Sequence, residues 1–286
     1  MPSPTDFNLS PYFDDFSESK KFHRVLFRPA FAVQARELTQ SQTILQNQVE
    51  KVSDHLFEKG AMIIPGEIGY DLNYYAVKLT SIASGVSLSS FSDIVLTGGS
   101  SGVRALVVGT DATDGTDPDT LYVKYLDSGT SKTSTAFTHG ETLTGTATLS
   151  DVETTISCVV RTCHTGSAAE IQAGTYYING FHVEVTNQTI VLDKYTNTPS
   201  YRVGLTVTES FVTPSDDSSL NDNAAGSSNV NAPGAHRFKI DLTLAKKTLT
   251  STEDSNFIEL LRLSEGLLQN KVRTTEYNIL EDTFAS

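Results

Sequence analysis

The sequence of 286 residues has no tryptophan and contains only two cysteines and two methionines. It also lacks any long apolar run, which argues against a helix that crosses a bilayer. Its first residues, MPSPTDFNLS, have neither the basic nor the apolar segment of a signal peptide. We therefore expect a soluble protein that is synthesised in a cytoplasm.

Basic residues are also scarce: 21 Lys and Arg stand against 34 Asp and Glu, for a formal net charge of -13 and a pI near 4.8. The field around such a chain repels phosphate groups. We therefore expect no nucleic-acid partner and no membrane partner. A charge of this size instead suits a subunit that must stay soluble at high concentration before it assembles.

The composition favours β structure, because hydrophobic residues make up 38% of the chain, charged residues make up 19%, and Ser and Thr are abundant. After Gly60, short alternating runs are separated by Gly and Pro, which is typical of strands and hairpins. Asn179-Gly180 gives the strongest hairpin signal. We predict a mainly β fold with one long N-terminal α-helix: a β-sandwich-like body with an inserted small SH3-like barrel.

The predicted helix runs from Val33 to about Lys59, a segment without Gly or Pro that ends at a candidate cap, Gly60. Its apolar residues form a narrow stripe at helical spacing, made of Leu38, Leu45, Val49, Val52 and Leu56. The stripe also fits a short heptad repeat that Gln42 interrupts. Two interpretations remain open: an amphipathic helix that lies on its own domain, and a helix in an oligomeric bundle.

The first 30 residues carry aromatic side chains and prolines without helical or alternating periodicity, which indicates an extended arm. The arm is too apolar for a disordered tail, so it must lie on a surface, and another chain could provide it. Its aromatic residues are candidate partner-docking residues, together with the helix stripe. They are Tyr12, Phe13, Phe16, Phe22 and Phe27.

The predicted organisation has five parts. They are a docking arm (1–30), the helix (31–60), the body (61–90 and 166–250), the inserted barrel (91–165), and a C-terminal hairpin with a short helix (251–286). Residues 214–237 form a long loop, because Ser, Asn, Asp and Gly dominate them. The segment FIELLRLSEGLLQNKV fits either a helix or a hairpin that turns at Ser264-Glu265-Gly266, and we prefer the hairpin.

Motifs that suggest chemistry have structural explanations. The segment Gly98 to Gly102 matches a G-x-S-x-G nucleophile elbow, but a strand follows it, so we expect a turn. Cys158 and Cys163 lie an odd number of residues apart on a predicted strand, so their thiols should face opposite sides and neither pair nor share a metal. The acidic run from Asp111 to Asp119 lacks the spacing of a calcium loop. We predict no catalytic, cofactor or metal residue.

Several sequence elements resemble a family of tail and baseplate structural proteins of contractile-tailed bacteriophages, notably those of marine bacteria and cyanobacteria. These elements are YFDDF, FHRVLFRP, VQARELTQ, QTILQNQ, YYINGF and HRFKIDL. The resemblance implies a non-enzymatic virion structural protein of the viral tail, made in the host cytoplasm, that builds the baseplate wedge or periphery or anchors tail fibres. It also implies other tail or baseplate proteins as partners and a homo-oligomer, with a trimer as one form.

An alternative is a receptor-binding or carbohydrate-binding β module of the tail tip. In this case the barrel or the loop from Asn221 to Asn231 would recognise a host-surface glycan. Tyr122 and Tyr125 share a strand and could face a sugar, although tyrosines on strands more often pack inside. A depolymerising hydrolase is a third possibility, for which the sequence offers no recognisable pair of carboxylates.

Overall fold

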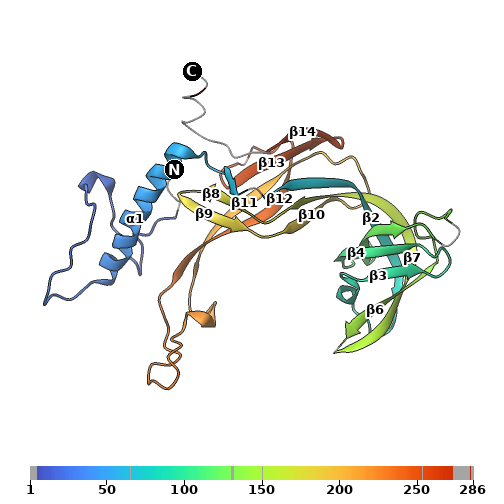
Figure 1. Cartoon of the computed structure of the whole chain (residues 1–286), viewed down its shortest axis with the longest axis horizontal. Coiled ribbons are helices and arrows are strands. Elements are labelled where there is room, and N and C mark those ends of the chain that lie inside the picture. The colour runs from blue at the N-terminus through green and yellow to red at the C-terminus, as the bar shows by residue number, and fades with distance from the viewer. Residues whose placement is uncertain are drawn as a thin grey trace.

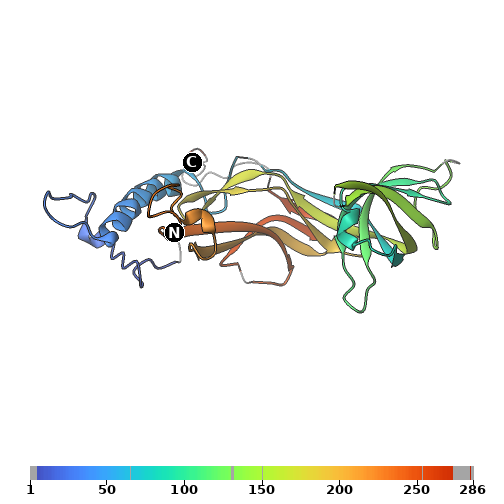
Figure 2. The ribbon, with the colours of Figure 1, turned by 90° about the horizontal axis from the view of Figure 1, so that it is seen from below.

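The computed structural model describes residues 5–64, 66–129, 132–149, 151–252, 254–272 and 284. The molecule is elongated, with the N-terminal arm and helix at one end and a ring-like sheet at the other (Figures 1 and 2). Packed sheets lie between them. Strands contain 46% of the residues, which confirms a mainly β fold with one N-terminal helix.

The helix and strand boundaries are as follows. The helical elements are η1 (Glu18–Lys20), α1 (Ala35–Leu56), η2 (Leu88–Phe91) and η3 (Ser218–Leu220). The strands are β1 (Met62–Ile64), β2 (Ile68–Ile82), β3 (Val95–Gly98), β4 (Arg104–Asp111), β5 (Thr120–Asp127), β6 (Thr142–Leu149), β7 (Val152–Ile171), β8 (Gly174–Ile178), β9 (Phe181–Val185), β10 (Gln188–Asp193), β11 (Tyr201–Val212), β12 (Arg237–Thr248), β13 (Phe257–Ser264) and β14 (Leu267–Lys271).

The strands form three antiparallel sheets. Their strand orders are β1-β8-β9, β10-β7-β2-β5-β4-β3-β6, and β12-β11-β13-β14. In the seven-stranded sheet β6 also pairs with β7, which closes a ring of strands. The prediction of an SH3-like barrel is wrong in this respect, since the sheet is ring-like but is not a barrel. Its two longest strands, β2 and β7, run out of the ring and into the body (Figure 1).

Two hydrophobic cores share β2 and β7. The body core lies among all three sheets and includes Ile68, Ile171, Tyr176, Ile178, Leu192, Leu205 and Leu261. The ring core includes Val77, Phe91, Leu96, Val107, Leu121, Leu143 and Ile156. At 15 and 20 residues, β2 and β7 greatly exceed the usual strand length of about 5–6. The predicted boundary between residues 165 and 166 therefore falls inside a continuous strand.

Helix α1 begins where the Glu37 side chain accepts a hydrogen bond from the Gln34 backbone N–H, at 2.9 Å. It ends at Leu56, because Phe57 is extended and its ring packs against Tyr177. The prediction that Gly60 caps the helix is wrong. Gly60 instead occupies the turn before β1 with φ of 87°, and its N–H donates to the Tyr177 carbonyl oxygen at 2.8 Å.

Two hairpin predictions are confirmed. β8 and β9 pair across Asn179 and Gly180, whose φ angles of 47° and 90° suit the tight turn that matches the twist of paired strands. β13 and β14 pair across Glu265 and Gly266 in the same way. The predicted short C-terminal helix falls on residues that lie almost entirely outside the described ranges.

The β11–β12 pair is a long hairpin, with register running from Tyr201 opposite Thr248 to Val212 opposite Arg237. The predicted loop lies at its end and contains η3 and an isolated bridge between Asn221 and Pro233. Figure 1 shows this loop extending away from the sheets.

The two cysteines lie on the same side of β7, so the prediction of opposite sides is wrong. Cys158 belongs to the ring core and Cys163 packs against it. The register between β2 and β7 shifts between Val160 and Thr162, which leaves Arg161 as an extra residue. Such a bulge reverses the alternation of the strand beyond it. Both cysteines are free thiols.

Gly166 offers a test of how tightly β7 is held between β2 and β10. A Cβ at this position would lie 2.7–2.9 Å from the backbone oxygens of Lys194, Asp193 and Tyr74. We predict that Gly166→Ala lowers the free energy of unfolding by about 1–3 kcal/mol, because backbone must shift. Gly69→Ala is the matched control, since its Cβ would meet only the Glu170 side chain at 3.4 Å. Equal thermal-melting shifts for the two variants would contradict this prediction.

Candidate docking surface

The first part of the arm packs on its own chain, at the β11–β12 hairpin. The Phe7 ring lies edge-on to Phe238 at 5.0 Å and to Phe211 at 5.9 Å between ring centroids. The Tyr12 ring stacks on Phe211 at 5.1 Å, and its hydroxyl hydrogen-bonds His236 Nδ1 at 2.8 Å. Tyr12, which was predicted to dock a partner, therefore has an intramolecular role in this structure.

The next residues of the arm lie against α1. Asp14 is buried, and its carboxylate accepts a hydrogen bond from the Thr43 hydroxyl. Asp15 accepts from the Gln40 side-chain amide at 3.1 Å. The helix therefore turns hydroxyl and amide groups toward the arm, where carboxylates accept their hydrogen bonds.

One ionic contact continues this polar seam between arm and helix, and a second lies within the arm. Glu18 accepts from the Asn47 amide at 2.7 Å and lies 3.3 Å from the Lys51 ammonium. The hydrogen bond from Asn47, followed by the contact with Lys51, lowers the pKa of the Glu18 carboxyl. Asp15 pairs with Lys20 at 2.8 Å, and this hydrogen bond lowers its pKa. These pairs are exposed, so they orient the arm more than they stabilise it.

The C-terminal half of α1 contacts the β8–β9 hairpin through polar groups as well. The Gln46 amide donates to the Gly180 carbonyl oxygen at 2.6 Å, and the Tyr177 hydroxyl donates to Asp54 Oδ1 at 2.5 Å. Burial, and then the bond to Asp54, raise the pKa of Tyr177. Burial and the neighbouring Asp54 carboxylate raise the pKa of Glu50. These polar contacts, together with the burial of Ile44, hold the helix on its own chain.

The apolar stripe of α1 consequently faces outward. The side chains of Leu38, Leu45, Val49 and Val52 are 53%, 68%, 47% and 63% exposed, and Leu56 is half-buried. The interpretation in which this stripe lies on its own domain is wrong for the described residues. The polar groups of the arm and hairpin occupy the opposite side of the helix and leave the stripe outside.

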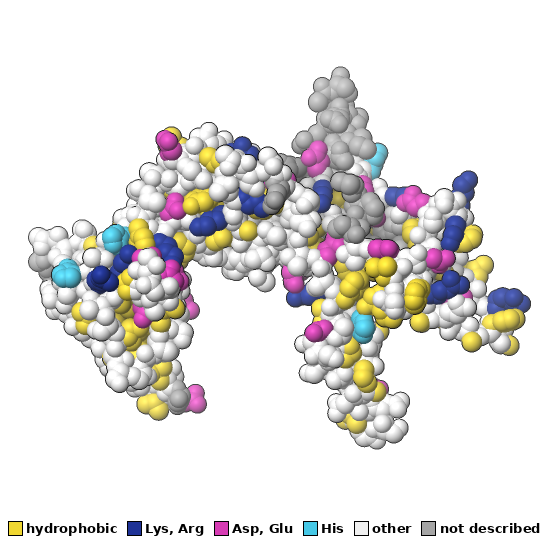
Figure 3. Space-filling view, turned by 180° about the vertical axis from the view of Figure 1, so that it is seen from behind, with side chains coloured by type: hydrophobic (Ala, Val, Ile, Leu, Met, Phe, Trp, Pro, Cys, Tyr) yellow, Lys and Arg dark blue, Asp and Glu magenta, His cyan; other side chains and the backbone are white. Residues whose placement is uncertain are grey.

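The loop of residues 21–34, between η1 and α1, continues this apolar surface. Of the aromatic residues that the sequence offers for docking, Phe22, Phe27 and Phe13 are exposed and Phe16 is half-buried. The prediction missed three exposed side chains of the same kind, Leu26, Phe31 and Val33. In Figure 3 hydrophobic side chains gather at this end of the molecule. We call the loop and the α1 stripe together the arm–helix surface.

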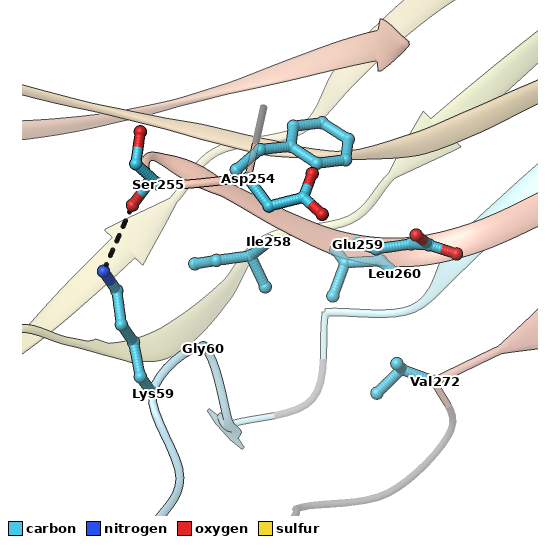
Figure 4. A pocket seen from close by; sticks show the side chains of 9 residues that line it. Lys59, Gly60, Asp254, Ser255, Ile258, Glu259, Leu260 and Val272 are labelled. Carbon is cyan, nitrogen blue, oxygen red and sulfur yellow. Dashed lines mark hydrogen bonds between the residues drawn. The ribbon is translucent and has the colours of Figure 1, made fainter. Parts of the chain in front are cut away.

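A shallow hollow lies on the body between the residues that follow α1 and strand β13, beside Lys59 and Ile258 (Figure 4). Its volume is about 410 Å³, and its two carboxylates, Asp254 and Glu259, both pair with Arg202, at 2.9 and 2.5 Å. The Arg262 hydrogen bond lowers the pKa of Glu259, although burial opposes it. The carboxylates that line this hollow are therefore ion-paired, which is unsuited to general acid–base catalysis.

The G-x-S-x-G segment from Gly98 to Gly102 is a turn, as predicted, and it surrounds a carboxylate. Glu141 Oε1 accepts from the Ser100 N–H at 3.0 Å, the Ser101 N–H at 2.6 Å and the Ser101 hydroxyl at 2.7 Å. Its other oxygen accepts from the Thr138 N–H at 2.8 Å. Burial alone would raise the pKa of Glu141, but these hydrogen bonds together outweigh burial and lower it. Ser100, the serine at the nucleophile position of the motif, and Ser101 thus both act as structural donors to Glu141.

The tyrosines proposed to face a glycan pack against other aromatic side chains instead, Tyr125 at the ring core and Tyr122 outside it. Tyr122 is 2% exposed and stacks on Tyr74 at 5.2 Å. Tyr125 packs against Tyr75 and Phe137, with ring centroids 4.9 and 5.3 Å away. The structure therefore supports the packing interpretation of these two side chains.

Two carboxylates of the nearby acidic run, Asp111 and Asp117, form ion pairs with lysines. Asp111 pairs with Lys194 at 2.6 Å, and Asp117 pairs with Lys78 at 2.8 Å. Across the described ranges, no group of three or more His, Cys, Asp or Glu side chains is placed to hold a metal ion. Among those same residues, no helix is both long and apolar enough to span a membrane.

These features define a class: a mainly β protein with two cores that shows its apolar residues on an N-terminal loop and helix. The chain belongs to the family described as Domain of unknown function (DUF4815), whose model matches residues 10–82 and 123–286. No curated protein and no solved structure matches the chain. The family match includes the whole arm–helix surface and passes over residues 83–122, which form η2, β3, β4 and the start of β5.

Glu141 gives a prediction with a defined pH dependence. The pKa of Glu141 is lowered in the folded protein, so the ionised carboxylate stabilises the fold. This contribution to the free energy of unfolding is complete above the ordinary carboxyl pKa, and it is lost as the pH falls through the lowered pKa of the folded state. We predict that Glu141→Gln costs about 1–3 kcal/mol of unfolding free energy at neutral pH, because an amide N–H would face a donor.

The difference in stability between wild type and Glu141→Gln should shrink as the solution is acidified below pH ~4, as followed by denaturant melts at several pH values. Glu153→Gln is the control, because Glu153 is exposed on β7. A difference that stays constant with pH, or one that Glu153→Gln reproduces, would show that the buried carboxylate does not stabilise the turn.

Proposed function

We propose that this chain is a structural protein of the tail or baseplate of a tailed bacteriophage. It builds the baseplate wedge or periphery, or anchors tail fibres, through protein–protein contacts and without catalysis. The arm–helix surface is the observation that carries the proposal. In this function the surface docks on a neighbouring tail protein, and the β body provides rigid bulk.

The energetic argument concerns loop 21–34, where Phe22, Leu26, Phe27 and Phe31 are each more than half exposed. Burying apolar surface yields roughly 25 cal/mol per Å², so a neighbour that covers these side chains gains a large driving force. Clustered exposed apolar side chains are typical of interaction sites.

Three sequence elements that carry the phage resemblance fall on this surface. FHRVLFRP covers residues 22–29, VQARELTQ covers residues 33–40 and QTILQNQ covers residues 42–48, so together they span most of the loop and the first part of α1. The resemblance, which covers most of the chain apart from the ring, therefore includes the region where the chain exposes apolar side chains. This coincidence favours an assembly role over a role that depends on the ring.

The loop also differs in charge from the rest of the chain. Between Glu18 and Glu37 there is no acidic residue, while Lys20, Lys21, Arg24, Arg28 and Arg36 are all basic. Lys20 and Arg36 contact Asp15, and the Arg28 guanidinium lies 4.1 Å from the Phe31 ring centroid. A fitting partner has an apolar groove with carboxylates at its rim.

The test is incorporation into particles. We predict that Leu26→Asp abolishes incorporation of the plasmid-supplied chain into tails of the phage that carries its gene, because a charge replaces a buried contact. Its melting temperature should not change, because Leu26 is 76% exposed in the free chain. Immunogold labelling and mass spectrometry of purified particles give the readout.

Leu267→Asp is the matched control, because Leu267 is 67% exposed on the body, away from the arm–helix surface. It should enter particles like wild type. Three outcomes would contradict the proposal: wild-type protein absent from purified particles, label on the capsid alone, or normal incorporation of Leu26→Asp.

A further inference from the structure

The exposed stripe of α1 has a spacing that matches one kind of partner closely. Including the polar member Gln42, its positions alternate by four and three residues along the entire helix: Leu38, Gln42, Leu45, Val49, Val52 and Leu56. This period of 3.5 residues is that of a coiled-coil seam, in which each side chain fits between four residues of another helix with the same period. A sheet or a flat surface has no such period, so the occupant is a helix.

The flanks of the stripe identify which helix fits. In a coiled coil, the positions beside the seam meet the partner's flanks, and their charges select it. Here these positions are all free of Asp, Glu, Lys and Arg: Thr39, Ser41, Gln46, Gln48, Ser53 and His55. The charged residues of α1 occupy the remaining positions, namely Arg36, Glu37, Glu50, Lys51 and Asp54. A copy of α1 therefore meets no like charge across the seam, although each whole chain carries -13.

Gln42 decides the direction of the two helices. If they ran antiparallel with their stripes in full overlap, Gln42 would face Val52, and its amide would be buried without a partner. If they run parallel and in register, Gln42 faces Gln42, and the two amides can hydrogen-bond to each other. One polar residue in the seam of a coiled coil commonly sets register in this way.

The contacts of α1 with its own chain leave room for this arrangement. Thr43, Asn47 and Asp54 hold the arm and the β8–β9 hairpin, and they lie on the side of the helix opposite the stripe. The hairpin also reaches one flank of the stripe, where Gln46 donates to the Gly180 carbonyl oxygen and Ser53 is buried. The stripe from Leu38 to Val52 stays exposed, and so do Gln48 and His55 on its other flank. In a parallel bundle of identical chains, the helices therefore meet in the centre and the β bodies point outward.

We infer that α1 forms a parallel, in-register bundle with α1 of one or two further copies of this chain, with Gln42 setting the register. The inference rests on the proposed function, because it names the partner of the α1 stripe, which is one part of the arm–helix surface. The other part, loop 21–34, stays available for a different tail protein.

The first test measures the mass of the full-length chain by light scattering after size exclusion, across a range of concentrations. Wild type should have two or three times the monomer mass of 31.0 kDa. Leu45→Glu should weaken self-association on the order of 100- to 1,000-fold, because it places unpaired charges in the seam. Leu267→Glu, with 67% exposure against 68% for Leu45, should assemble like wild type.

Two further measurements distinguish loss of the contact between α1 helices from misfolding of a variant. Gln42→Leu should assemble about tenfold or more tightly than wild type, a change that misfolding does not produce. Added salt should strengthen assembly of the wild type, because it screens repulsion between copies of charge -13 while the seam holds no ion pair. Weaker assembly in either case would contradict an uncharged apolar seam.

Direction is tested by oxidative cross-linking. Gln42→Cys alone should give a covalent dimer on a non-reducing gel, while wild type, with its buried or half-buried Cys158 and Cys163, should not. A cross-link that forms only when Gln42→Cys is mixed with Val52→Cys would overturn the parallel arrangement.

The outcomes also separate this inference from the proposed function. A chain that remains at 31.0 kDa at every concentration overturns the bundle, while particle incorporation through loop 21–34 can still succeed. An oligomer that is absent from phage particles leaves the bundle standing and overturns the structural role in the virion.

Discussion

The polar contact between α1 and the β8–β9 hairpin determines which face of α1 is exposed to solvent. The Tyr177 hydroxyl donates to Asp54 of the helix, and the Gly180 carbonyl oxygen accepts from Gln46. Tyr177 lies on β8 and Gly180 lies in the turn that follows it, so the hairpin fixes both groups. Buried polar groups need partners, so a helix rotated to place its leucines here would leave these groups unsatisfied. The rotation of α1 follows from this requirement, and the exposure of its apolar stripe follows from the rotation.

The arm reinforces the same rotation from the other side. Its carboxylates at Asp14, Asp15 and Glu18 are matched with hydroxyl, amide and ammonium groups of α1, and its first aromatic residues anchor on the β11–β12 hairpin. Because the chain is tied down on both sides of the loop, at Glu18 and again at Ala35, residues 21–34 project as a closed loop. A loop held at both ends loses less conformational entropy on binding than a free tail does.

Local features were predictable from the sequence and long-range ones were not. The helix lacks Gly and Pro over its length, and Asn179-Gly180 and Glu265-Gly266 suit turns with left-handed residues, so each signal lies within a few residues of the element it specifies. The face of α1 depends on Tyr177, which is more than a hundred residues away. Similarly, the position of Cys163 depends on a bulge at Arg161 that strand alternation cannot reveal. The exposure of Phe22 and Phe27 in the loop was predictable from its composition, whereas the packing of Tyr12 depends on a distant stacking partner, Phe211.

The segment that the family match leaves out belongs to the ring core and not to the body core. The match includes the arm–helix surface, β2, β7 and the whole body, and it passes over residues 83–122, which contribute Phe91, Leu96 and Val107 to the ring core. The long strands β2 and β7 run through both cores, so there is no flexible joint between the body and the ring along these strands. β7 is paired with β6, β2 or β10 along its length. The ring is therefore rigidly placed by the body, at the end opposite the arm–helix surface (Figure 1). If the chain binds through its N-terminal end, as proposed, the ring lies far from the point of attachment.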